Sequence, residues 1–117
     1  MPRETFDRAH FAMMTGDDTA LQAEIVAIFR VQAALWGRLL IPDAPTSVWA
    51  DAAHTVKGSA RGLGLWRLAD VCEDAENLGR AGAVEGAAVK TVLSRVRHAL
   101  DDALQALASN VAEAAAA

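Results

Sequence analysis

A histidine, a lysine and a glycine occur together in residues 54–58, at spacings that would place them on one side of a helix. At about 100° per residue, Lys57, Gly58 and Arg61 lie within about 60° of His54. The mostly apolar side chains gather on the opposite side: Trp49, Ala52, Val56, Ser59 and Leu63. We therefore expect His54 to face outward. There a neutral imidazole is a competent nucleophile, and Lys57 would favour an anion beside it.

A glycine inside a helix costs about 1 kcal/mol relative to alanine, so Gly58 requires an explanation. A missing side chain at this position would let another molecule approach His54. The alternative is that His54 is only a solvated surface residue. The run KGSARGLG is not expected to bind a nucleotide, because it lacks the residue order of a phosphate-binding loop and no strand precedes it.

This region resembles a known family. It is similar to the signature of histidine phosphotransfer (HPt) domains in Ala53-His54-Thr55-Val56-Lys57-Gly58-Ser59-Ala60, then Leu63-Gly64, Leu68-Ala69 and Cys72-Glu73. The likeness continues through Gly64-Leu65-Trp66-Arg67-Leu68 and Glu76-Asn77-Leu78-Gly79-Arg80. The resemblance implies that His54 is phosphorylated at Nε2. It also implies that Lys57 pairs with the phosphoryl oxygens and that Gly58 admits the partner. Ser59 matches a small polar position, and its inward angle favours a structural role.

Glu76 and Arg80 have two possible interpretations. Glu76 falls where several HPt domains carry glutamine beside the histidine. A glutamate there could accept a hydrogen bond from Nδ1–H and leave Nε2 free, although it would also repel a phosphoryl group. Arg80 matches a basic residue near the site. Alternatively, the two residues form an ordinary surface pair one helical turn apart.

The resemblance implies a docking surface around His54, with apolar side chains and a polar rim. The second predicted helix has a wider apolar arc than one buried stripe requires. The candidates for contact with a partner are Arg61, Phe11, Met14, Ile28 and Gln32. For the apolar candidates, burial in the core is the alternative.

Composition limits the class of protein. The chain has 117 residues, 53% hydrophobic, with a net charge of −4 at pH 7. The length predicts one domain over 1–117 with its own core, and the acidic balance disfavours nucleic acid as a partner. The sequence contains no uncharged apolar stretch of about 18 residues, so we expect no membrane span. The charged N-terminal residues do not resemble a signal peptide. Because Cys72 is the single cysteine, we expect a cytoplasmic protein. The high content of alanine and arginine favours a bacterial protein.

Alanine is abundant and strand signals are nearly absent, so we expect an all-α fold. Apolar periodicity predicts helices over 6–14, 19–40, 46–63, 65–78 and 84–109. The expected N-terminal caps are Thr5, then Asp17 or Asp18, then Thr46 or Ser47. Four long helices with short connections predict an antiparallel four-helix bundle, with the short first helix across one end. Residues 1–4 and 110–117 are expected to be frayed or disordered.

The remaining polar candidates are expected to be structural. Cys72 should be a buried thiol, and His10 and His98 should be surface residues. No metal site is expected.

The resemblance thus implies a phosphoryl carrier between the aspartates of response-regulator receiver domains, with a hybrid histidine kinase upstream. No ATP site is recognisable, so we expect no ATP-dependent kinase activity. No cofactor is expected, Mg²⁺ being supplied by the receiver, and the protein should be a monomer. Two alternatives stay open: a helical adaptor or degenerate HPt module that binds a receiver or kinase without transfer, and an enzyme such as a phosphohistidine phosphatase or a dimerising kinase domain.

Overall fold

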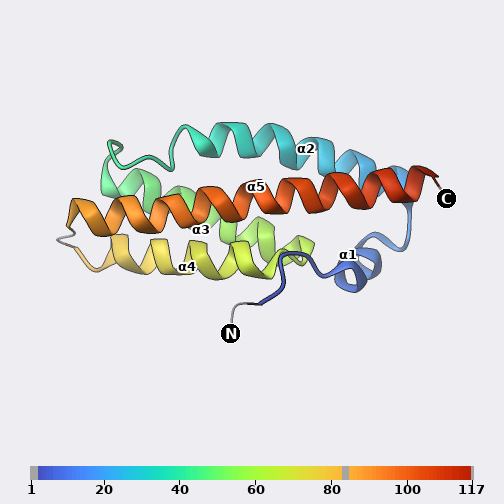
Figure 1. The fold of residues 1–117 in the computed structure, drawn as a ribbon, viewed down its shortest axis with the longest axis horizontal. Coiled ribbons are helices and arrows are strands. Elements are labelled where there is room, and N and C mark those ends of the chain that lie inside the picture. The colour runs from blue at the N-terminus through green and yellow to red at the C-terminus, as the bar shows by residue number, and fades with distance from the viewer. Residues whose placement is uncertain (1–2, 83–84, 117) are drawn as a thin grey trace.

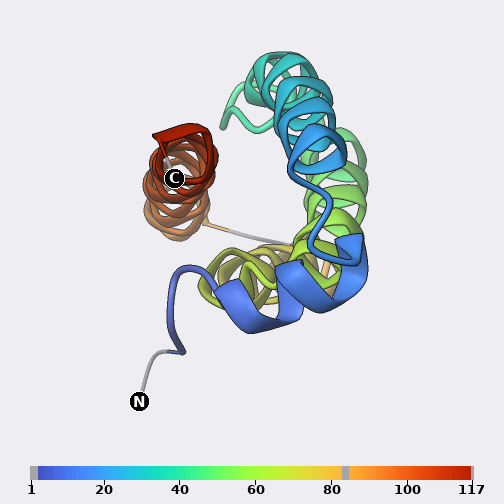
Figure 2. The same cartoon turned by 90° about the vertical axis from the view of Figure 1, so that its right-hand side faces the viewer.

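The computed structural model describes residues 3–82 and 85–116, and in this part of the chain all regular structure is helical. The elements are α1 (Arg8–Thr15), α2 (Thr19–Gly37), α3 (Thr46–Leu63), α4 (Trp66–Arg80) and α5 (Gly86–Ala116) (Figure 1). Viewed along the bundle, α2, α3, α4 and α5 surround a common core, and α1 lies across one end (Figure 2). The predicted antiparallel four-helix bundle with a short first helix is therefore confirmed.

The cap of α1 differs from the prediction. Asp7, and not Thr5, caps the helix, because its Oδ1 accepts a hydrogen bond from the backbone N–H of His10 at 3.0 Å. Its Oδ2 accepts from Trp66 Nε1, also at 3.0 Å, which ties α1 to the start of α4. His10 packs edge-on against Trp66, with ring centroids 4.9 Å apart, and its Nε2 lies 3.2 Å from the carbonyl oxygen of Gly62. His10, expected at the surface, is half-buried and packs at the junction of three helices.

Between the two candidates for the cap of α2, Asp18 is confirmed. Its Oδ1 accepts from the N–H of Leu21 at 3.0 Å. The helix ends at Gly37, three residues before the predicted end at Leu40. The chain there tightens into a turn in which the N–H groups of Leu39 and Leu40 both lie 2.9 Å from the carbonyl oxygen of Trp36. This turn brings Leu40 fully into the core.

The cap of α3 was predicted wrongly. The helix begins at Thr46, so neither Thr46 nor Ser47 serves as the cap. Pro45 takes that position without a side-chain hydrogen bond, and its carbonyl oxygen accepts from the N–H of Val48 at 2.9 Å. The predicted end near Leu63 is confirmed, because Gly64 adopts a left-handed conformation with φ of 78°.

The last two helices run further than predicted. α4 continues through Gly79 to Arg80, and Gly82, with φ of 99°, follows the cap residue Ala81. The predicted start of the fifth helix near Val84 lies outside the described residues. α5 extends seven residues beyond the predicted end at 109, because its alanine-rich terminus favours helix.

The far end of α5 is tied to α1. Arg8 forms an ion pair with Glu113, so the last turns of α5 contact the helix that crosses this end. Fraying of residues beyond 109 stays a prediction.

The core is drawn from all five helices. The apolar stripe on α5 is buried along its whole length: Val89, Val92, Val96, Leu100, Ala103 and Leu107. Cys72 is also fully buried, and burial raises the pKa of its thiol to about 12, so it behaves as an inert apolar side chain.

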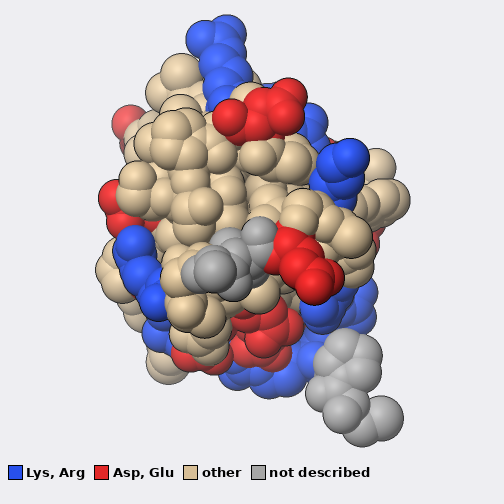
Figure 3. All heavy atoms as spheres, turned by 90° about the vertical axis from the view of Figure 1, so that its left-hand side faces the viewer, with Lys and Arg blue, Asp and Glu red and all other residues tan. Residues whose placement is uncertain are grey.

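The apolar character of the helices and the charge on the surface bear on two kinds of partner, a membrane and a nucleic acid. In the described residues, no helix is long and apolar enough to cross a membrane. Acidic and basic side chains are interspersed on the end face that carries the α2–α3 and α4–α5 connections (Figure 3). No single sign of charge gathers there, as binding to a phosphate backbone would require.

Gly79 sets the distance between α3 and α4. A Cβ at this position would lie 2.7 Å from Ala50 Cβ and 3.0 Å from Trp49 Cζ3. Both neighbours are buried and cannot move freely. The two helices therefore approach more closely at Gly79 than a side chain would permit.

We predict that Gly79→Ala lowers the free energy of unfolding by about 1–3 kcal/mol, since overpacking outweighs the better helix propensity of alanine. Gly62→Ala is the matched control, because a Cβ there meets nothing within 4 Å. The control should leave stability level or raise it by up to about 1 kcal/mol. Urea unfolding followed by circular dichroism measures both, and equal or opposite effects would contradict the packing argument.

Candidate functional site

His54 lies on the outer face of α3. Its side chain is 63% exposed, whereas Trp49 and Val56, on the opposite side of the same helix, are buried. The outward orientation that the residue spacing predicts is therefore present. Ser59 is half-buried beside Leu63, as its inward angle predicts.

Glu76 connects His54 to Lys57 across the α3–α4 contact. Its Oε2 lies 2.8 Å from His54 Nδ1, and its Oε1 accepts a hydrogen bond from Lys57 Nζ at 2.6 Å. An ionised carboxylate can only accept, so the short contact requires the imidazole proton to be on Nδ1. Nε2 is then the unprotonated nitrogen of the neutral ring, and within the described residues it has no hydrogen-bond partner.

The environment of Glu76 favours its ionised form. Its side chain and that of Lys57 are only 13% and 14% exposed, so solvent screens this ion pair weakly. The hydrogen bond from Lys57 is the main cause that holds the pKa of Glu76 below its ordinary value, and the nearby His54 ring contributes further. The site thus carries a fixed negative charge behind the imidazole and a cation beside it.

Arg80 lies at the edge of the site, where its main partner is Asp51. The sequence analysis did not single out Asp51. Its Nη2 lies 2.6 Å from Asp51 Oδ1 and 3.8 Å from Glu76 Oε2. The surface pair one turn apart therefore exists, but it is the longer of the two contacts. Asp51 precedes His54 by three residues, so its position on the same helix face was a signal that the sequence contained.

The approach to His54 is free of side chains on the Gly58 side. A Cβ at Gly58, or at Gly62 one turn further, would meet nothing within 4 Å. Arg61 is exposed and lies 3.5 Å from Glu73 on α4. This geometry agrees with the interpretation of Gly58 as a clearance position.

Four of the five docking candidates are exposed, and one was predicted wrongly. Met14 and Ile28 are more than half exposed, and Gln32 and Arg61 also reach the surface. Ile28 and Gln32 line a shallow groove between α2 and α3 together with Ile25, Phe29, Ser59 and Leu63. Phe11 is only 1% exposed, because α1 turns this ring inward against Phe6, with centroids 5.5 Å apart. It cannot contact a partner.

The site brings together an imidazole, an ammonium group and a carboxylate. In the part of the chain that is described, no three His, Cys, Asp or Glu side chains lie close enough to hold a metal ion. His98, on α5, is exposed as predicted.

We predict that Glu76→Gln makes the protein less stable at neutral pH and that this difference shrinks in acid. The pKa of Glu76 is lower in the folded than in the unfolded chain, where its ordinary value is 4.5. Its ionised form therefore adds stability above that value, and this stability is lost as the pH falls through the folded pKa. Chemical unfolding at about pH 7 and about pH 3 measures the difference.

Glu113→Gln is the matched control for this experiment. Arg8 also lowers the pKa of Glu113, but both members of that pair are more than half exposed. Salt at about 0.5 M should remove most of the effect of Glu113→Gln and little of the effect of Glu76→Gln. A pH-independent loss of stability in Glu76→Gln would contradict the ionised bridge.

Comparison with known proteins agrees with this geometry. The family model described as Hpt domain matches residues 20–114. The crystal structure of histidine phosphotransferase ShpA from Caulobacter crescentus is similar to the whole fold, with 40% sequence identity and a TM-score of 0.74. The match covers 96% of this chain and 95% of that chain. The comparison with curated proteins finds no match. Because the family model spans most of the chain and the similar structure covers nearly all of it, this protein belongs to the Hpt domain family.

Proposed function

We propose that this protein carries a phosphoryl group on His54 Nε2 and passes it between aspartates of receiver domains in a His–Asp phosphorelay. Membership of the Hpt family supports a phosphotransfer role. One observation carries the assignment to His54: Glu76 holds Nδ1 at 2.8 Å, which leaves Nε2 as the free nucleophile on an exposed surface.

The proposed step balances without a proton leaving the ring. His54 Nε2 attacks the phosphorus of an aspartyl phosphate, a P–N bond forms, and the P–O bond to the aspartate breaks, releasing the carboxylate. The Nδ1 proton stays in place, so the phosphorylated ring becomes cationic. The carboxylate of Glu76 stabilises the positive charge that develops on the ring, and it is already oriented before the reaction.

Lys57 has a second role in this proposal. One N–H of its ammonium is bound to Glu76 at 2.6 Å, which leaves two donors for the phosphoryl oxygens. This pairing offsets the repulsion between Glu76 and the phosphoryl group. The same step run in reverse, with a second receiver, returns the phosphoryl group to an aspartate.

The proposed step requires particular partners. A receiver domain would supply the aspartyl phosphate and the Mg²⁺ that neutralises phosphoryl charge. A hybrid histidine kinase would stand upstream, and the exchange would take place in the cytoplasm. Gly58, Arg61, Ile28 and Gln32 would form part of the docking surface.

We predict that His54→Gln abolishes phosphoryl acceptance and leaves the fold intact, because the side chain is 63% exposed and its loss removes only the nucleophile. His98→Gln, at another exposed histidine on α5, is the matched control and should accept normally. The measurement is uptake of acid-labile, base-stable label from a phosphorylated receiver domain.

Two outcomes would contradict the proposal. Label retained in His54→Gln would identify a different acceptor. A parent protein that binds receiver domains but never takes up label would be an adaptor without transfer.

We predict that Gly58→Gln keeps or raises stability but strongly impairs transfer from receivers. A Cβ at this position would meet no other part of the protein beyond its own helix backbone within 4 Å, so the fold tolerates the side chain. A displacement of about 1 Å at the reacting atoms can cost on the order of a hundredfold in rate. Gly37→Gln on α2 is the control, since a Cβ there is equally unobstructed.

A small phosphoryl donor such as phosphoramidate shows whether Gly58→Gln blocks the approach of the receiver domain or damages the site around His54. If the parent accepts from it, Gly58→Gln should accept equally well, because the small donor needs no docking surface. Normal transfer from receivers to Gly58→Gln would refute the clearance argument.

A further inference from the structure

A groove runs along α5 beside α2 and the turn that follows α2. The two helices lie side by side in opposite directions (Figure 1). The groove consists of three hollows of about 520, 490 and 270 Å³. Arg30 lines the first and the third, and Arg97 lines the first and the second, so the three adjoin one another. Along α2 the lining extends from Ala23 to Gly37, a length of about 21 Å. We call this feature the α2–α5 groove, and its length suits a segment of another chain.

The cations of the α2–α5 groove lack ion-pair partners, unlike most cations of this protein. Six of the 11 Lys and Arg side chains form ion pairs with Asp or Glu. Within the described residues, the other five have no such partner: Arg30, Arg38, Arg67, Lys90 and Arg97. All of these except Arg67 line the groove, and all four that line it are exposed. Unpaired positive charge is therefore concentrated here, on a chain whose net charge is −4.

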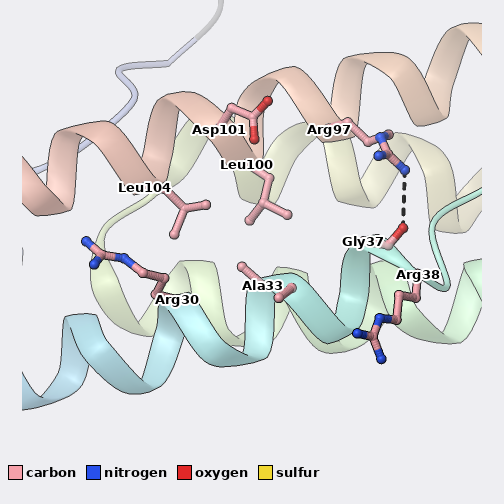
Figure 4. A pocket seen from close by; sticks show the side chains of 9 residues that line it. Arg30, Ala33, Gly37, Arg38, Arg97, Leu100, Asp101 and Leu104 are labelled. Atoms are coloured by element: carbon pink, nitrogen blue, oxygen red, sulfur yellow. Dashed lines mark hydrogen bonds between the residues drawn. The ribbon is translucent and has the colours of Figure 1, made fainter.

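Figure 4 shows the central part of the α2–α5 groove. Leu100 and Leu104 of α5 point toward α2 and form an apolar floor. The guanidinium of Arg30 lies at one end of this floor. The guanidinium of Arg97 lies at the other end, where its Nη1 donates a hydrogen bond to the carbonyl oxygen of Gly37 at 3.2 Å. Because Gly37 follows Arg30 by seven residues, the two cations lie about 10 Å apart along α2.

Two further charged residues line this part of the groove without facing its floor. Asp101 is the only carboxylate among the described residues that line the groove. In Figure 4 it lies on the side of α5 away from α2, and the side chain of Arg38 turns away from α5. The apolar floor thus has a cation at each end and no carboxylate over it. A ligand with two negative charges separated by an apolar group is complementary to this arrangement.

The sides of the groove allow the close approach of a helix. Alanines recur four residues apart on both sides, at Ala23 and Ala27 of α2 and at Ala108 and Ala112 of α5. The ridges of a third helix pack into the spaces beside such small side chains. In a helix, residues seven apart lie on one face and about 10 Å apart along the axis, which matches the separation of the two cations.

We propose that the α2–α5 groove binds an amphipathic helix of a partner protein, with two carboxylates about seven residues apart and an apolar stripe between them. The carboxylates pair with Arg30 and Arg97, and the stripe covers the apolar floor. At about 100° per residue, Arg30 lies about 160° around α2 from both Ile28 and Gln32. A helix in the groove therefore leaves the candidate docking surface beside α3 free. Binding there goes beyond the phosphotransfer function and does not depend on it.

The probe is a fluorescein-labelled helical peptide of about 16 residues, with two glutamates seven residues apart and leucines between them on the same face. Fluorescence anisotropy with the full chain at up to about 1 mM should give a Kd of about 100 µM or below. A control peptide of the same composition, with its glutamates on opposite faces, should bind at least about tenfold more weakly. Amide chemical shifts of the isotope-labelled chain should change along the groove and not around His54.

Charge reversal tests the two cations. Arg30→Glu and Arg97→Glu should each raise the Kd by about tenfold or more, because each places like charges together. A peptide with lysines in place of the glutamates should bind the double variant and not the parent. Arg95→Glu is the matched control, since it makes the same charge change on α5. Arg95 pairs with Asp74 of α4 and lies about 160° around the helix from Arg97, so the Kd should stay the same. Circular dichroism checks that each variant is folded.

Three outcomes would overturn the proposal. The first is a probe that does not bind at the highest concentration. The second is equal binding of the two peptides, or an equal effect of all three reversals, which would indicate general charge attraction. The third is self-association of the chain in sedimentation analysis that Arg30→Glu abolishes, because the occupant would then be a second copy. None of these measurements uses phosphoryl transfer, so failure here leaves the function of His54 untouched, and the reverse is also true.

Discussion

The Glu76 carboxylate holds the site together, with one oxygen 2.8 Å from the His54 ring and the other 2.6 Å from the Lys57 ammonium. It belongs to α4, whereas both of its partners belong to α3. The site therefore depends on the register and closeness of these two helices. Gly79, one turn beyond Glu76, permits that closeness, because a Cβ there would overlap Ala50 and Trp49. The packing that stabilises the bundle and the contact that selects the His54 tautomer thus have a common geometric basis.

Glutamate at this position combines two opposing electrostatic effects. Its negative charge favours a cationic imidazole ring and opposes a phosphoryl group nearby. The Lys57 ammonium offsets the repulsion, because it is bound to the carboxylate and is only 14% exposed. Its remaining N–H groups can still donate hydrogen bonds to other acceptors. Arg80, 2.6 Å from Asp51 and 3.8 Å from Glu76, adds a second cation at the edge of the site. An excess of one sign of charge around His54 is avoided by this arrangement.

The two sides of α2 serve different purposes. Its buried side contributes Phe29 and Trp36 to the core, with ring centroids 5.6 Å apart in an edge-on contact. Its outer side keeps large apolar residues in contact with solvent, among them Ile28, Val31 and Leu35. The groove beside Ile28 and Gln32 lies between this surface and the Ser59 and Leu63 side chains of α3. The docking surface of the proposed function would therefore use residues of α2 and α3.

The sequence by itself determined the features that depend on local periodicity. The all-α class, the outward angle of His54 and the exposed position of Gly58 all follow from helix geometry and side-chain type, which act within a few residues. Helix ends were less predictable. The capping residue Asp7 also accepts a hydrogen bond from Trp66, which is 59 residues away. Only the tertiary structure decided that Phe11 is buried, that His10 packs on Trp66, and that Glu76 reaches His54 from 22 residues away. These outcomes depend on how helices pack, and packing is set by contacts between segments distant in the chain, which no local pattern encodes.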